Sequence, residues 1–204
     1  MRMSQNKSQF VAVASIAAEL SAVMEVAKEI SLAAANAKAI AFRAGEKAKG
    51  FQPITDFINE LAKETIELVN NINEHALKLY RLTVKEHRMS EACKRFEEVA
   101  AGACSAPYAS SLSVPLQKAM QRRADCHRQF SRHVSELVAQ LADVMHPARA
   151  ARVIAANSRI EASQAGEYLQ SLQAVAESVD NAAQIIHDKV HKCRSALSMI
   201  NSVD

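Results

Sequence analysis

The sequence predicts an all-α protein, a long antiparallel four-helix coiled-coil bundle made of two tandem helical hairpins. Three observations support this fold class. The 204 residues include only four glycines and four prolines, so the turns that a β-rich or doubly wound fold requires are missing. The apolar residues, 49% of the chain, are mainly Ala, Leu, Val and Ile, a composition typical of long helices. They also recur at heptad spacing along almost the whole chain.

The first helix is predicted from Val13, because alternating steps of three and four residues meet only apolar side chains from there to Ala44. Gly45 follows at once and is a typical helix stop signal. The same spacing resumes at Phe51 and reaches Ala103, which predicts a second, longer helix. Three residues interrupt this second series: Thr65, His75 and Glu86.

Residues 105–113 contain a proline and several serines without heptad spacing, so we interpret them as a connector between helices. A third, mostly apolar series then runs from Leu116 to Ala165, and Gly166 follows it directly. Pro147 lies inside this series, where a proline predicts a kink or a short break in the helix.

A fourth series runs from Leu172 to Ile200. The two turns and the connector are about 60 residues apart, so two hairpins can lie side by side with both turns at one end. At 1.5 Å per residue, each middle helix would span about 80 Å. The predicted units are a first hairpin at 1–104 (turn near 45–49), a connector at 105–113 and a second hairpin at 114–204 (turn near 166–170).

Polar residues inside the heptad series need partners. Matching the layers of the four helices places His75 beside Leu141, and Lys189 beside Ala27, where a lysine would extend its ammonium group outward. A polar cluster that fixes the register of the helices is predicted near the connector from three residues: Glu86, Arg123 and His127.

Charge and composition exclude several classes of function. The 25 basic and 22 acidic residues give a net charge of +3, too small for a nucleic-acid-binding protein, and the basic run at 122–133 is interpreted as a solvated helix face. No apolar stretch approaches the roughly 20 residues of a membrane span. The four cysteines form no Cys-x-x-Cys pair, so we expect free thiols and a cytoplasmic protein.

A shift of 121 residues superimposes the two hairpins. Between residues 27 and 62, 10 of 36 positions are then identical, including the pairs Asn36 with Asn157 and Gly45 with Gly166. The heptad registers also coincide under the same shift. We therefore predict a duplicated helical hairpin.

The segments ANAKAIAFRAGEKAKGF (35–51) and ANSRIEASQAGEYLQSLQAVAESV (156–179) resemble the hairpin tip of bacterial methyl-accepting chemotaxis receptors. Receptors of that family form a four-helix bundle from two identical hairpins in two chains. The resemblance implies that this chain carries both hairpins itself, as a monomeric pseudo-dimer.

The resemblance also implies partners. Family tips bind a histidine kinase and its coupling protein and pack against other chemoreceptors, so we expect a chemotaxis-type signalling protein that binds or mimics receptor tips. The candidate partner-binding residues at the two tips are Asn36, Arg43, Glu46, Phe51, Asn157, Glu161 and Glu167.

Several tip positions depart from the family pattern. The family's tip glutamate is Ile40 in the first copy, its arginine is Gln164 in the second, and Pro53 replaces a valine that helps to line the coupling-protein groove. The alternative interpretation is therefore a repurposed helical adaptor or structural protein that kept the fold and lost kinase coupling.

No enzyme, cofactor or metal site is predicted. The sequence contains no phosphate-binding loop, nucleophile elbow or paired carboxylate motif. His187 and His191 share a helical face near Cys193, but a metal site needs three or four ligands from fixed elements, and we interpret these histidines as solvated.

The connector end offers a possible second interface. The first and fourth helices are expected to stop before the second and third, which would continue as a pair with an exposed apolar stripe. The residues of this stripe are Met89, Phe96, Met120 and Phe130, with Leu116 beside them. We expect this end to dock a second copy of the chain or another protein.

Overall fold

The computed structural model describes residues 2–102 and 109–201, with side chains at 11–102 and 110–199. In these ranges it contains helices and no strand, which confirms the all-α class. The long helices are α1 (Arg2–Ala44), α2 (Phe51–Gly102), α3 (Ser113–Asp143), α4 (Met145–Ala162) and α5 (Leu169–Asn201). Short 3₁₀ helices precede α2, α3 and α5: η1 (Gly45–Ala48), η2 (Ala109–Leu112) and η3 (Gly166–Tyr168).

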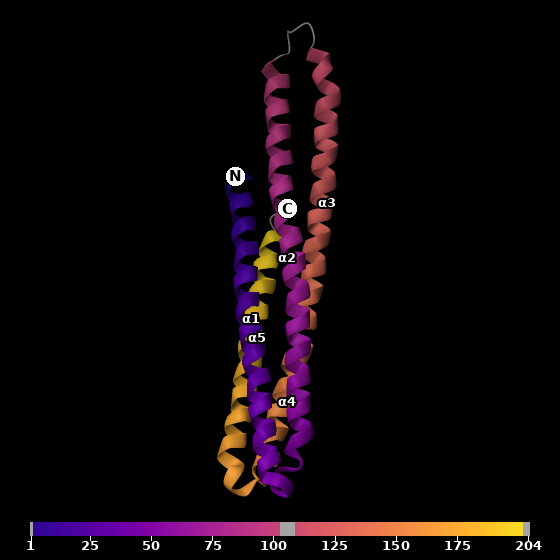
Figure 1. The fold of residues 1–204 in the computed structure, drawn as a ribbon. Coiled ribbons are helices and arrows are strands. Elements are labelled where there is room, and N and C mark those ends of the chain that lie inside the picture. The colour runs from indigo at the N-terminus through magenta and orange to yellow at the C-terminus, as the bar shows by residue number, and fades with distance from the viewer. Residues whose placement is uncertain (1, 103–108, 202–204) are drawn as a thin grey trace.

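The long helices lie side by side along one axis (Figure 1). Helix α1 packs against α2 and α5, α2 packs against α3 and α4, and α5 closes the arrangement against α4 and the end of α3. Every helix is antiparallel to the neighbours it packs against (Figure 1). Helices α3 and α4 together form one arm, so the body of the molecule has four arms. Among the helices described, none is both long and apolar enough to cross a membrane.

Both turns at the lower end depend on glycine. Gly45 has a φ of 59° and Gly166 a φ of 58°, and no other described residue has a positive φ. Side chains clash in this left-handed region, so glycine ends a helix there at little cost. Helix α1 ends directly before Gly45, whereas α4 already ends at Ala162. The predicted stop at Gly45 is confirmed, and the second turn begins slightly earlier than expected.

The predicted break at Pro147 is also confirmed, three residues before the proline. Helix α3 ends at Asp143, Val144 forms a turn, and Pro147 lies in the first turn of α4. Proline has no N–H, so the carbonyl of Asp143 loses the donor that a continuous helix would supply. Val144 keeps helical φ and ψ angles (−61° and −23°), so the arm continues in nearly the same direction.

The expected connector at 105–113 is only partly described. Residues 105–108 lie outside the described residues, Ala109–Leu112 form η2, and Ser113 begins α3. The connector therefore ends in helical structure earlier than the sequence suggested.

The buried residues follow the predicted heptad series, but more positions per heptad are buried than the series predicts. In α2 the first position of each heptad is buried from Phe51 to Leu79, as expected. A further buried row follows at Thr55, Ala62, Val69, Ala76 and Thr83. A helix that packs against two neighbours buries a stripe of three positions per heptad instead of two. The row consists of small residues, which allow the adjacent helices to approach closely.

The internal repeat has a counterpart in the packing. Under the shift of 121 residues, buried positions of the first hairpin fall on buried positions of the second; examples are Ala34 with Ala155, Ala41 with Ala162, Phe51 with Leu172 and Ile58 with Val179. Polar contacts also correspond. Ser31 Oγ donates a hydrogen bond to Asn59 Oδ1 (2.7 Å), and the equivalent residues Arg152 and Asp180 form an ion pair (Nε–Oδ1 3.5 Å).

One layer prediction holds, one holds in part and one is wrong. His75 Nδ1 lies 2.8 Å from Gln140 Oε1, next to the expected level of Leu141, and Glu86 Oε1 lies 2.9 Å from His127 Nδ1. The expected cluster near the connector forms in part, because the described contacts join Glu86 to His127 without Arg123. Lys189, however, does not lie level with Ala27. Its Nζ is 2.7 Å from Glu19 Oε2, because α5 is displaced along α1 by about one heptad and a partly buried ammonium needs a carboxylate.

Candidate partner-binding tip

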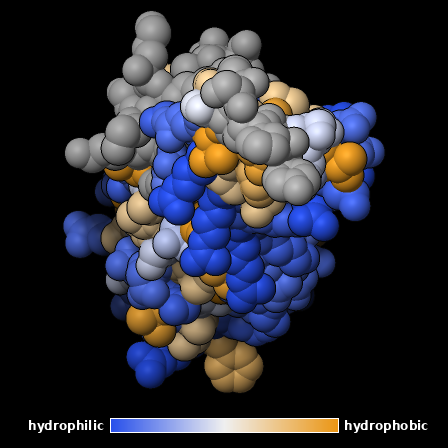
Figure 2. Space-filling model, turned by 90° about the horizontal axis from the view of Figure 1, so that it is seen from above, coloured by the Kyte–Doolittle hydropathy of each residue, from blue (hydrophilic) through white to orange (hydrophobic). Residues whose placement is uncertain are grey.

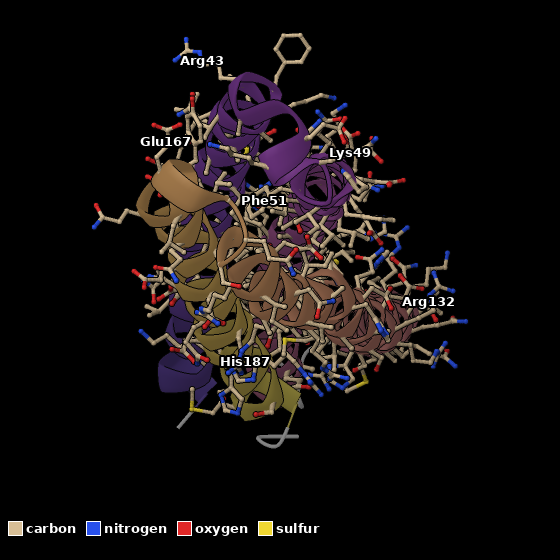
Figure 3. The ribbon with its side chains drawn as sticks, turned by 90° about the horizontal axis from the view of Figure 1, so that it is seen from below. Arg43, Lys49, Phe51, Arg132, Glu167 and His187 are labelled. Carbon is tan, nitrogen blue, oxygen red and sulfur yellow. The ribbon has the colours of Figure 1, made fainter. Side chains whose placement is uncertain are left out.

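The tip is built on small side chains. Near the two turns the buried residues form their own cluster, which consists of Ala37, Ala41, Ala48, Phe51, Ala162, Ala165 and Leu172. Alanines keep the backbones close, and the two large members fill the remaining space between the hairpins. Seen from below, Phe51 lies inside the bundle, whereas Arg43, Lys49 and Glu167 lie toward its rim (Figure 3).

Five of the seven predicted tip residues are exposed: Asn36, Arg43, Glu46, Asn157 and Glu167. Glu161 is half-buried. Phe51 requires a correction, because its side chain is 0% exposed. It cannot contact a partner at the surface unless the bundle opens, so its place is in the tip core, where it supports the turn that carries Glu46.

The Glu161 side chain lies against the backbone of the first hairpin at Gly50. A Cβ atom placed on Gly50 would overlap Glu161 Oε2 and Cδ, so any other residue at position 50 would displace the carboxylate from its present position. Under the repeat shift, the equivalent positions are Ile40 and Ser171. Ile40 instead packs against the apolar tip cluster. The two sides of the tip are therefore chemically different.

Charged side chains from both hairpins meet at the tip. The first hairpin presents Lys47, Lys49 and Glu46, and the second presents Glu167. Lys47 Nζ lies 3.8 Å from Glu167 Oε1, and Lys49 Nζ lies 3.3 Å from Glu46 Oε2. All four side chains are more than 60% exposed, so these ion pairs contribute little to stability and their groups remain accessible to a partner.

Sequence reasoning missed two exposed apolar residues near the tip. Phe42 is 80% exposed and Ile160 is 62% exposed. Each lies directly before a residue that the sequence singled out, Arg43 or Glu161. Heptad counting passes over them because they fall outside the apolar series. An exposed aromatic residue next to an arginine is the composition of many binding hot spots.

A charged clamp holds α4 to α5 above the second turn. Arg159 Nη2 donates a hydrogen bond to Asp180 Oδ2 (2.7 Å), and Arg152 Nε lies 3.5 Å from Oδ1. The hydrogen bond from Arg159, together with both positive charges, lowers the pKa of the Asp180 carboxyl. In the first hairpin, Lys38 Nζ and Asp56 Oδ1 are 2.6 Å apart at a similar level.

The described residues show no group of three or more His, Cys, Asp or Glu side chains that could hold a metal. His187 Nδ1 lies 3.2 Å from Asp188 Oδ1. Cys193 is fully buried, and burial, followed by the charge of Glu19, raises the pKa of its thiol to about 12. Burial also raises the pKa of Cys126. Both thiols are therefore protonated at neutral pH and poor nucleophiles.

No family model, no curated protein and no solved structure matches this chain.

Proposed function

We propose that this protein is a non-enzymatic signalling protein that binds a protein partner through the tip of its helical bundle, in the manner of chemotaxis receptors. One observation supports the proposal above all others. Two turns with the same positive-φ glycine, each followed by an exposed glutamate, lie together at one end of the molecule.

The proposal also covers how the bundle is assembled from the chain. One chain supplies both hairpins of a receptor-like bundle, as a coiled-coil pseudo-dimer. The correspondence of buried positions and polar contacts under the repeat shift supports this view, as do the two equivalent glycines. A second chain is then not required to complete the tip.

The proposed partner is a chemotaxis coupling protein or its histidine kinase, in the cytoplasm. The exposed side chains Arg43 and Glu46 are the groups through which it would be recognised, and Phe42 would supply apolar contact. Arginine and aromatic residues contribute much of the binding energy at protein interfaces, while the small exposed ion pairs at the rim tune specificity.

A helical adaptor that no longer couples to a kinase is the alternative function. Its support is the difference between the two sides of the tip, where Glu161 is packed against Gly50 and Ile40 is apolar. A carboxylate held against the backbone offers less to a partner than one in solvent.

The test is a calorimetric titration of the purified protein with a chemotaxis coupling protein and, separately, with its kinase. We expect binding that Arg43→Ala weakens at least tenfold, which corresponds to about 1.4 kcal/mol. The matched control is Arg81→Ala, which removes an exposed arginine from the middle of α2. Absence of binding by the unmodified protein would overturn kinase coupling and favour the adaptor.

A further inference from the structure

Helix α1 leaves the far end of α2 uncovered. Ser31 pairs with Asn59 on the antiparallel neighbour. Counting outward from this pair places Arg2, the first residue of α1, level with Arg88. The remaining residues of α2, to Gly102, therefore run beyond α1, and Figure 1 shows the pair α2–α3 extending past the other helices.

Helix α5 leaves α3 uncovered in the same way. Asp180 lies between Arg152 and Arg159 on the antiparallel arm, so the end of α5 at Asn201 is level with residues 131–138. The expectation of a two-helix extension is thus supported. Phe130, however, does not belong to its exposed stripe: it is 1% exposed and packs in the main core, since that core reaches up to its level.

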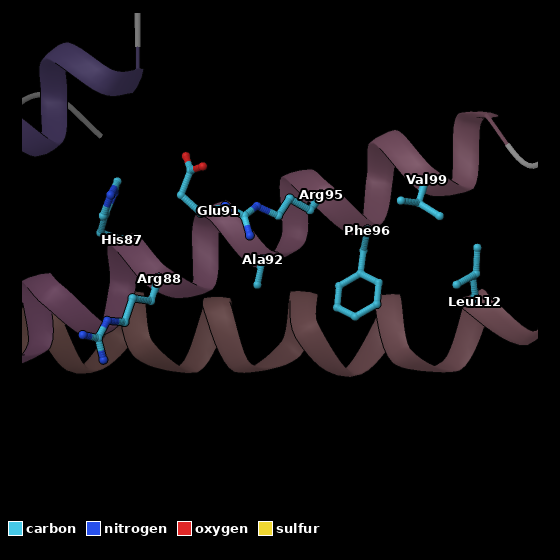
Figure 4. Close-up of a pocket in the computed structure, with 8 residues that line it drawn as sticks. All are labelled: His87, Arg88, Glu91, Ala92, Arg95, Phe96, Val99 and Leu112. Carbon is cyan, nitrogen blue, oxygen red and sulfur yellow. The ribbon is translucent and has the colours of Figure 1, made fainter.

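The extension is less tightly packed than the body and exposes apolar side chains. Met89 and Phe96 are partly buried between its helices, whereas Val99 and Val114 are each 55% exposed. A groove of about 490 Å³ runs along α2 to Leu112 (Figure 4). Viewed from this end, hydrophobic residues are visible among the hydrophilic ones (Figure 2).

The face of α3 that continues the α5 interface carries no charge between residues 114 and 124; Arg128 is the first charged residue on it. Arg152 marks the side of the arm that contacts α5, and steps of one heptad back along the arm lead to Ala124 and Gln117. The exposed residues on and beside this line are Val114, Gln117, Met120, Gln121 and Ala124. Charged residues, including Lys118 and Arg122, lie elsewhere on this basic helix. An uncharged exposed face over three turns indicates a contact surface.

The corresponding face of α2 carries charges of both signs. Asn59 and Asp56 contact α1. Steps of seven residues from Asn59 lead to Lys94, and steps of seven residues from Asp56 lead to Glu91 and Glu98. A like helix in antiparallel orientation can place these carboxylates opposite the lysine. This pattern avoids the repulsion that two faces of a single charge sign would produce.

We propose that a second copy of this chain covers the extension, with the two extensions overlapping end to end to continue the four-helix bundle. Beside the extension, the two places that longer α1 and α5 helices would occupy are adjacent. They require two helices that run in opposite directions. An inverted copy meets both requirements, because its α2 takes the place of α1 and its α3 the place of α5. Each contact is then antiparallel, as in the body.

Because the two copies are related by a twofold axis, the assembly stops at a dimer. A copy that fills the two uncovered positions has its own positions filled in return, so no further chain is added. A single helix of another protein would cover only one position. Each extension is about 22 Å long at 1.5 Å per residue, which places the interface at the small end of specific ones, so the dimer should dissociate on dilution.

The test is the molecular mass from sedimentation equilibrium over a range of concentrations. We expect the mass to rise from 22.2 kDa toward twice that value. Met120→Lys, and separately Gln117→Lys with Ala124→Lys, should keep the protein monomeric, since these exposed positions do not affect folding. The matched control is Ile185→Lys on α5: Ile185 is 42% exposed and Met120 is 41% exposed.

Two results would overturn the proposal. One is a mass of 22.2 kDa at every concentration up to about 1 mM, the range of weak specific binding. The other is a dimer that Ile185→Lys dissociates and Met120→Lys does not. X-ray scattering adds a check on geometry: end-to-end overlap should make the dimer much longer than the ~78 Å of α2, whereas side-by-side packing should not. This interface is at the opposite end from the proposed tip site, so either can fail alone.

Discussion

Glu161 and Gly50 meet across the two hairpins: the carboxylate of one hairpin occupies the space where any other residue at position 50 would place its Cβ. This contact joins the second copy of the repeat to the first at the tip. It also restricts the position of a side chain that the sequence pattern had assigned to a partner.

Substitution of Gly50 by alanine should displace Glu161 without unfolding the tip. The carboxylate is the end of a flexible side chain and can rotate away, so we expect a loss of at most about 1 kcal/mol in the free energy of unfolding measured in urea. Adding Glu161→Ala should cancel this loss. Gly102→Ala is the control, because a Cβ there meets no atom within 4 Å. A loss of several kcal/mol would contradict this account.

The two turn glycines should respond alike to substitution. Gly45→Ala and Gly166→Ala each force a Cβ into the left-handed region, at a cost of about 1–2 kcal/mol. Neither Cβ meets another atom within 3.4 Å, so backbone strain alone sets the cost. Thermal unfolding of both variants checks the equivalence. Losses that differ by more than about 1 kcal/mol would show that the turns are not equivalent.

Stability in acid should depend on Asp180. Its pKa is lowered in the folded state, chiefly by the hydrogen bond from Arg159, so the stabilisation is present above the unfolded pKa of about 3.9 and is lost as pH falls through the lower folded value. Asp180→Asn should remove this part of the pH dependence below about pH 4. Urea unfolding between pH 2 and pH 6 measures it, with the exposed Asp143→Asn as control. Identical acid profiles for Asp180→Asn and the unmodified protein would refute the assignment.

The pair of Lys189 and Glu19 should show coupling. Removing the lysine alone, in Lys189→Met, leaves a half-buried carboxylate without its cation, which we expect to cost about 1–3 kcal/mol. Lys189→Met with Glu19→Leu should recover most of this loss. A double-mutant cycle in urea gives the coupling energy, and additive losses would mean that the ion pair does not form.

Heptad spacing was sufficient to locate the helices, both glycine turns and the break near Pro147, because these features depend on local sequence. It could not fix the displacement between α1 and α5, since a shift by one whole heptad still places apolar residues opposite apolar residues. The partner of Lys189 was wrong for that reason. Phe42 was missed because it falls outside the apolar series. The contact of Glu161 with Gly50 was missed because it depends on the space left between the hairpins.

Because a single chain carries both turns, the two turns can differ in sequence. In a bundle of two identical chains, one mutation changes both sides of the tip at once. Here a mutation at residue 161 changes one side only, and Ile40 on the other side is unaffected. The tip can thus evolve a polar face and an apolar face independently, so that a single molecule can present two different surfaces to its surroundings.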